Sequence, residues 1–156
     1  MADPRELLEA YVPTAKVMQL ATVDERGDPY VNNLWCASTL RPDRLYFISR
    51  PDRLHCEYLR QRPRVAGALL AIELTAPDQK VRGVTFTGTA VELPRQGIDA
   101  QISVYAGRWP QVAAAIDPVR MAAGETHHRL YEIRVLSWVL YDEENFKPPR
   151  QPVEAY

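Results

Sequence analysis

The sequence predicts a mainly β, α+β domain in which six antiparallel strands form a barrel with flanking helices. Short runs rich in β-branched and aromatic residues recur along the chain, and tight turns separate most of them. Strands joined in this way pair antiparallel, and such sheets form barrels. With 156 residues, 46% of them hydrophobic, the chain can bury a core, and we expect one domain over residues 1–156.

The first fifty residues are expected to form one helix and three strands. Residues 4–18 have apolar side chains at helical spacing, and Pro13 is expected to divide this helix into two pieces. Two runs, 17–23 and 30–38, flank residues with turn chemistry and are expected to form a hairpin. A third strand, rich in aromatic and branched residues, is expected at 45–49.

The rest of the chain is expected to alternate between helices and strands. Asp52 is expected to cap the next helix, and three prolines in the C-terminal tail predict irregular structure there. In chain order, the expected elements are a helix at 53–61, strands at 65–74 and 80–92, a two-part helix at 95–116 and a strand at 129–141.

Composition and charge argue against several classes of function. A net charge of −1 and a pI near 6.3 create no strong field that favours nucleic acid or a membrane surface. The charged N-terminus lacks the apolar run of a signal peptide, so we expect a cytoplasmic protein. Cys36 and Cys56 are expected to stay reduced. Adjacent His127 and His128 point to opposite sides of an extended segment, which argues against a zinc site.

The strand-to-helix corner from Ser49 to His55 is the first candidate binding site. A helix N-terminus presents unpaired backbone N–H groups and the positive end of its dipole, and both attract phosphate. Ser49 can donate a hydrogen bond, and His55 falls in the first helical turn. Arg50 or Arg53 can form charge-assisted bonds. The residues leave a second interpretation open, a solvated arginine-rich turn.

The strand from Asn32 to Ala37 is the second candidate. Its backbone can hydrogen-bond to the edge of a flat ring while Leu34 or Trp35 packs on a face of that ring. The alternative is a half-buried strand with two asparagines at its wetter end. Cys36 has no evident charged group to activate its thiol, so inert packing is expected.

The third candidate is Arg82, which lies near the start of the expected strand 80–92. Gly83 and Gly88 within this strand indicate bulges or a close backbone approach, such as that of a ligand. An arginine near a strand start is also typical of a surface charge. The residues alone leave both interpretations open.

Five runs carry a resemblance to a known family. They are LATVDERGDPYVNNLWCAS, LYFISRPDRLHCEYLRQRPRVAGAL, VRGVTFTGTAVEL, YAGRWP and LYEIRVLSWVLYDEENF. In this order and spacing, they resemble the pyridoxamine 5′-phosphate oxidase-like proteins, the FMN-binding split-barrel superfamily, and in particular its small bacterial members. The resemblance implies a split β-barrel that forms a homodimer, with FMN at the subunit interface.

The resemblance also implies roles for individual residues. The backbone of Asn33–Ala37 would contact the flavin ring, and the corner would bind the FMN phosphate through Ser49 and basic residues at or near Arg53 and His55. His55 stands where many members have a lysine, which implies phosphate binding that weakens as the pH rises.

Three further positions are implied to lie near the cofactor. Arg82 matches a basic residue that opens the strand approaching the flavin. Gly83 stands where the true oxidases tend to have a ring-binding glutamine. Lys147, in the segment Asn145–Lys147, is implied to reach the flavin of the partner subunit.

These observations predict an FMN-dependent oxidoreductase that acts on an unidentified small molecule. The sequence offers no compelling general acid or base, and it lacks the C-terminal tryptophan and arginine signature of the genuine pyridoxamine phosphate oxidases. Two alternatives remain. One is a non-catalytic module that binds a flavin or another ligand. The other is a haem- or deazaflavin-binding member of the same fold.

Overall fold

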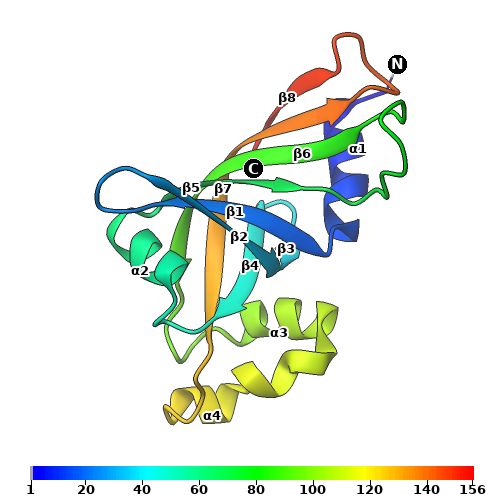
Figure 1. The fold of residues 1–156 in the computed structure, drawn as a ribbon. Helices are drawn as coiled ribbons and strands as arrows, with labels where there is room; N and C mark the ends of the chain where they lie inside the picture. The colour runs from blue at the N-terminus through cyan, green and yellow to red at the C-terminus, as the bar shows by residue number, and fades with distance from the viewer. Residues whose placement is uncertain (1) are drawn as a thin grey trace.

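The chain folds into an antiparallel β half-barrel with helices packed at its two ends (Figure 1). The computed structural model describes residues 2–156. Its strands are β1 (Val17–Val23), β2 (Pro29–Trp35), β3 (Ala37–Thr39), β4 (Arg44–Ser49), β5 (Arg64–Leu69), β6 (Arg82–Glu92), β7 (Arg129–Asp142) and β8 (Arg150–Glu154). Its helices are α1 (Pro4–Tyr11), α2 (Leu54–Gln61), α3 (Asp99–Arg108) and α4 (Pro118–Ala122), with 3-10 helices η1 (Val12–Thr14) and η2 (Pro110–Ile116).

Strand β7 organises the sheet, whose order is β2-β1-β5-β6-β7-β4-β3. One edge of β7 pairs with β6 along nearly its whole length. Its other edge is shared: β4 pairs with residues 129–134, and β8 pairs with residues 137–141. In Figure 1, α3 and α4 gather beyond the end of β4, whereas α1 lies at the opposite end of the sheet.

Two apolar cores lie on the two faces of β4. Leu45 and Phe47 point into the larger core inside the half-barrel, where Phe47 stacks on Tyr131 with ring centroids 4.9 Å apart. The alternate residues Tyr46 and Ile48 pack against the smaller core beneath α3 and α4. Strand β4 therefore separates the interior of the half-barrel from the helical layer.

A buried carboxylate joins the N-terminal helix, the sheet and the C-terminal residue. Asp43, which is fully buried, accepts two hydrogen bonds from the Arg5 guanidinium, at 2.6 and 2.8 Å, and one from Trp138 Nε1 at 2.7 Å. The backbone N–H groups of Arg41 and Tyr156 also donate to this carboxylate. Burial alone raises the pKa of Asp43, but the hydrogen bonds outweigh it and hold the pKa well below the usual range.

The fold class is confirmed, and the sequence-based expectations differ from the structure mainly in the number of strands. Eight strands form instead of six, because the expected strand 30–38 is interrupted at Cys36 and because the tail forms β8. The tail tolerates Pro152 since β8 pairs only with β7 and lies at an edge. The expected strand 65–74 ends at Leu69.

The helices also depart from the expectations at their ends. The first helix ends near Thr14, because Val17 already pairs in β1. Asp52 is not the cap of α2: Arg53 takes the N-cap position, and no side chain caps it. The two-part helix at 95–116 appears as α3 and η2, and α4 is an additional short helix. No helix within residues 2–156 is long and apolar enough to cross a membrane.

We expect Asp43→Asn to destabilise the fold by about 3 kcal/mol, because it removes the buried charge that holds the Arg5 guanidinium and leaves only the more exposed Glu9 to pair with it. Asp43 stabilises the fold above the ordinary carboxyl pKa, and this contribution is lost as the pH falls through the lower folded-state value. Urea unfolding over a range of pH measures both effects. The control, Asp52→Asn, changes an exposed carboxylate and should cost less than about 0.5 kcal/mol. Equal effects of the two variants would contradict this account.

Candidate functional site

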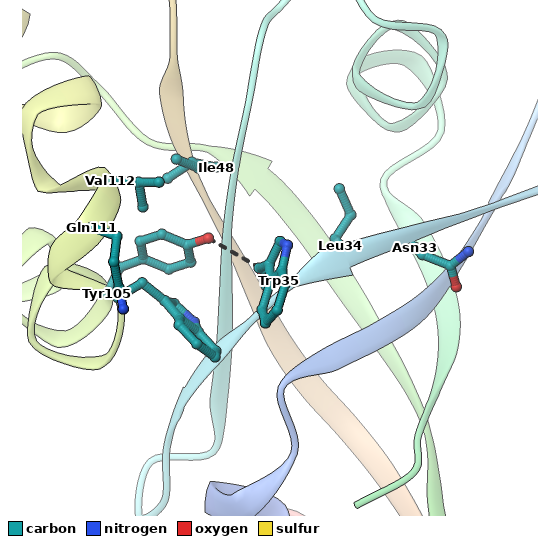
Figure 2. A pocket seen from close by; sticks show the side chains of 8 residues that line it. Asn33, Leu34, Trp35, Ile48, Tyr105, Gln111 and Val112 are labelled. Atoms are coloured by element: carbon teal, nitrogen blue, oxygen red, sulfur yellow. Dashed lines mark hydrogen bonds between the residues drawn. The ribbon is translucent and has the colours of Figure 1, made fainter.

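A mostly apolar cavity of about 410 Å³ lies between the sheet and the helical layer (Figure 2). This volume is within the range of small-molecule sites. Its strand wall comes from β2 and β4, and its helical wall comes from α3 and η2. The strand wall consists of Asn33, Leu34, Trp35 and Ile48, and the helical wall of Tyr105, Trp109, Gln111 and Val112.

Hydrogen bonds from aromatic side chains fix the helical wall to the strands. The Tyr105 hydroxyl donates to the carbonyl of Trp35 at 3.2 Å, drawn as the dashed line in Figure 2. Trp109 Nε1 donates to the carbonyl of Cys36 at 2.8 Å. The indole rings of Trp35 and Trp109 meet edge to face, 4.8 Å apart. These contacts hold the cavity open in a defined shape and use the polar atoms of both helical aromatic residues.

The strand predicted to contact a ring forms one side of this cavity. Strand β2 lies at an edge of the sheet, so its outer N–H and C=O groups have no strand partner within residues 2–156. Of the five predicted residues, Asn33, Leu34 and Trp35 line the cavity, while the side chains of Cys36 and Ala37 are buried. Burial raises the pKa of the Cys36 thiol to about 12, which fits inert packing.

An unpaired polar atom lies beside this strand wall. Asn32 Oδ1 is buried and has no hydrogen-bond partner among residues 2–156. Asn32 is on the same face of β2 as the cavity-lining Leu34, because side chains alternate along a strand. A buried acceptor without a donor is costly in a folded protein. A ligand N–H that reached this face of β2 would satisfy the Asn32 acceptor.

The structure brings Ser49 and His55 together. Their side chains are buried, and Ser49 Oγ lies 2.8 Å from His55 Nε2. They lie on the face of β4 that carries Phe47, whose ring centroid is 6.2 Å from that of His55. Burial, and next the charge of Arg53, lower the pKa of His55. Neutral His55 can accept the hydroxyl hydrogen of Ser49, in which case that hydrogen is not donated to a ligand.

The exposed part of the corner gathers two arginines and a histidine, and the Arg50 guanidinium there donates to Asp52 Oδ2 at 3.3 Å. Arg50 and Arg53 are exposed, and half-buried His128 lies close enough for the charges of both arginines to affect its pKa. Burial, and next the charge of Arg50, lower the pKa of His128. His128 reaches the corner because Ser49, at the end of β4, pairs with Arg129 at the start of β7. This cluster has the character of an anion site.

Arg82 and Lys147 lie away from the corner. Arg82 pairs with Asp142, thirteen residues beyond Arg129 along β7, and this separation corresponds to roughly 40 Å of strand. The Arg82 guanidinium sits 5.6 Å from the ring of Tyr11, and its buried Nε has no partner among residues 2–156. Lys147 lies between β7 and β8 at this same end. Within one chain, the structure therefore does not bring these two residues to the corner.

Sequence reasoning did not identify the helical wall, Ile48 or His128. Nothing in the spacing of α3 and η2 shows that they face β2, because that contact depends on the long connection from β6 to β7. A usable signal was the pair Tyr105 and Trp109: aromatic side chains with a polar atom require a partner when they are buried.

The family model for pyridoxamine 5′-phosphate oxidase matches residues 4–138, and the chain belongs to this family. The resemblance found in the sequence is thereby confirmed. No curated protein matches the sequence.

Solved structures show the same fold at low sequence identity. A haem-binding protein from Mycobacterium smegmatis has a TM-score of 0.77 and 16% identity, covering 99% of this chain and 59% of that one. An FAD-binding protein from Mesorhizobium loti has a TM-score of 0.65 and 22% identity, with 85% and 90% of the chains covered. The haem storage protein of Vibrio cholerae has a TM-score of 0.67 and 17% identity, with 86% and 91% covered. Proteins of this fold thus hold different cofactors.

We expect His55 to titrate below the ordinary histidine pKa of 6.5, because burial disfavours its charged form. The unfolded chain then binds the proton more tightly. The contribution of neutral His55 to the free energy of unfolding is therefore fully present above pH 6.5. It is lost as the pH falls through the pKa of His55 in the folded state. NMR titration of the imidazole gives the pKa, and unfolding at several pH values gives the linkage. His55→Gln should lose this part of the pH dependence, whereas His128→Gln should keep it. A His55 pKa above 6.5 would contradict the prediction.

Proposed function

We propose that the protein binds FMN, with the ring in the cavity and the phosphate at the cationic corner, and acts as a flavin-dependent oxidoreductase. One observation carries this proposal: β4 connects the two parts of the site. Ile48 lines the cavity, and Arg50, two residues further on, belongs to the corner. An apolar space beside a cationic cluster matches a molecule with a flat ring at one end and a phosphate at the other.

The proposal gives each part of the site a physical task. Edge strand β2 would orient the ring through its outer backbone groups and Asn32 Oδ1. Arg50 and Arg53 would pair with the phosphate. The helical wall would keep water from one face of the ring. When bound, FMN supplies hydride and electron transfer, and the protein supplies binding and orientation.

Haem is the second candidate, because two of the structural neighbours are described as haem-binding or haem storage proteins. Of the eight lining residues, Tyr105 alone is of a type that ligates haem iron. Its hydroxyl is engaged with the Trp35 carbonyl, and burial raises its pKa to about 12. His55 is buried against Ser49. These contacts favour FMN over haem.

The proposal includes a homodimer that forms through one face of the sheet. Six side chains from β5, β6 and β7 lie in paired rows on this neutral sheet face: Ala66, Ala68, Thr85, Thr87, Ser137 and Val139. All are small or medium-sized and uncharged, and they are exposed or half-buried. Depletion of charge is typical of the centre of an interface. In such a dimer, Arg82 and Lys147 of one subunit would contact the cofactor bound by the other.

The phosphate assignment is tested by comparing FMN with riboflavin, which has the same ring without the phosphate. We expect Arg50→Ala combined with Arg53→Ala to weaken FMN binding at least tenfold and to leave riboflavin binding unchanged, because only FMN carries the phosphate charge. Titration followed by flavin fluorescence measures both affinities. Arg26→Ala, at an exposed turn, is the matched control. Equal losses for the two ligands would argue against the corner as the phosphate site.

The dimer assignment is tested with a charge placed on the neutral sheet face. Thr87 is exposed and shares a hydrogen bond of 2.6 Å with Ser137. We expect sedimentation to show a dimer of the 17.8 kDa chain, and Thr87→Arg to convert it to a monomer, because buried arginines on both subunits would lack partners. Val119→Arg, on α4, should remain dimeric. A dimer that survives Thr87→Arg would rule out this face.

A further inference from the structure

The eight side chains that line the cavity are all uncharged at neutral pH. They are the four of the strand wall and the four of the helical wall. Tyr105 stays protonated because burial raises its pKa to about 12. The cationic groups of the corner lie beyond the cavity, at the end of β4. A charged ligand in the cavity would therefore lose part of its hydration without gaining a side chain of opposite charge.

Arg108, next to the helical wall, is turned away from the cavity. Arg108 precedes Trp109, and its guanidinium lies 4.7 Å from the centre of the Trp109 ring. Its Nη2 is directed to the backbone carbonyls of Thr14 and Ala15, each at 3.5 Å. It lines a separate small pocket beside Cys36. Arg108 is thus held by η1 and its neighbours, and it is not placed to neutralise an anion in the cavity.

The polar atoms of the helical wall leave one group available to a ligand. The Tyr105 hydroxyl and Trp109 Nε1 already donate to the carbonyls of Trp35 and Cys36. The Gln111 carboxamide makes no side-chain hydrogen bond within residues 2–156 and borders the cavity in Figure 2. A carboxamide can donate to a carbonyl-type oxygen. The remainder of this wall offers aromatic rings and the apolar side chain of Val112.

We propose that the helical wall binds an uncharged, planar aromatic molecule with a carbonyl-type oxygen, which the Gln111 carboxamide recognises. This inference rests on the proposed function in one respect: it makes this molecule the substrate that lies beside the flavin ring. Contacts with the half-buried ring of Trp109 supply most of the affinity for the aromatic ligand, since Tyr105 is only 2% exposed and offers it little surface. The uncharged walls exclude anionic relatives of the same size.

The experiment compares coumarin, a neutral planar lactone, with coumarin-3-carboxylate, which has the same rings and a negative charge. Calorimetric titration of the purified protein, with and without FMN, should show that coumarin binds at least tenfold more tightly than coumarin-3-carboxylate. Val112→Arg places a cation at the helical wall, where Val112 is 38% exposed, and should improve binding of the carboxylate at least tenfold. The matched control, Val119→Arg, changes a residue that is 77% exposed on α4 and should leave both affinities unchanged.

A second variant tests the recognition of the carbonyl oxygen. Gln111→Leu should weaken coumarin binding about tenfold and leave binding of naphthalene, which has no oxygen, unchanged. Equal affinity for the two coumarins, no binding of either, or no response to Val112→Arg would overturn the proposal. FMN titration of the same proteins tests the proposed function independently of the substrate class. A preference for coumarin without FMN binding would overturn only the flavin assignment. FMN binding without the preference would overturn only the substrate class.

Discussion

The buried ion pair between Asp43 and Arg5 is the interaction on which the arrangement of the sheet depends. Asp43 precedes β4 directly, Arg5 lies in α1, and Trp138 donates to the same carboxylate from β7. The network therefore fixes the start of β4 against the middle of β7. Strands β4 and β8 pair with different parts of the same edge of β7. Fixing the start of β4 on β7 therefore also fixes the position of its far end along β7. The far end of β4 carries Ile48 of the cavity and the corner that follows it.

Charge is separated along the candidate site. The cavity between β2 and η2 is lined by uncharged side chains, and the cationic groups gather beyond the end of β4. This separation matches a ligand whose ring and anionic group lie at opposite ends. It also limits what else the cavity can hold, since a second anion there would have no partner. The hydrogen bonds of Tyr105 and Trp109 to strand carbonyls hold the uncharged helical wall in place, and they thereby maintain this separation of charge.

The sequence was sufficient for the fold class, the family and the placement of Ser49 and His55 at one strand-to-helix corner, because these depend on periodicity, turn chemistry and short separations. The hydrogen bond between the two side chains was not predicted. The sequence was insufficient where long-range contacts decide the outcome. One local expectation was also wrong: Arg53 takes the cap position of α2, and Asp52 instead accepts a hydrogen bond from Arg50. Strand β8 was missed because its pairing with β7 outweighs the presence of Pro152. The helical wall was missed for the same physical reason: its residues gain their role only from contact with β2.

The central claim is that the cavity and the corner together hold FMN. The most direct measurement is the visible absorption spectrum of the protein as purified, followed by mass spectrometry of the ligand released on denaturation. The account predicts the two absorption bands of an oxidised flavin and the mass of FMN, or, for protein purified without ligand, the appearance of those bands when FMN is added. A haem Soret band, the spectrum and mass of a deazaflavin, or a colourless protein that takes up no FMN would contradict it.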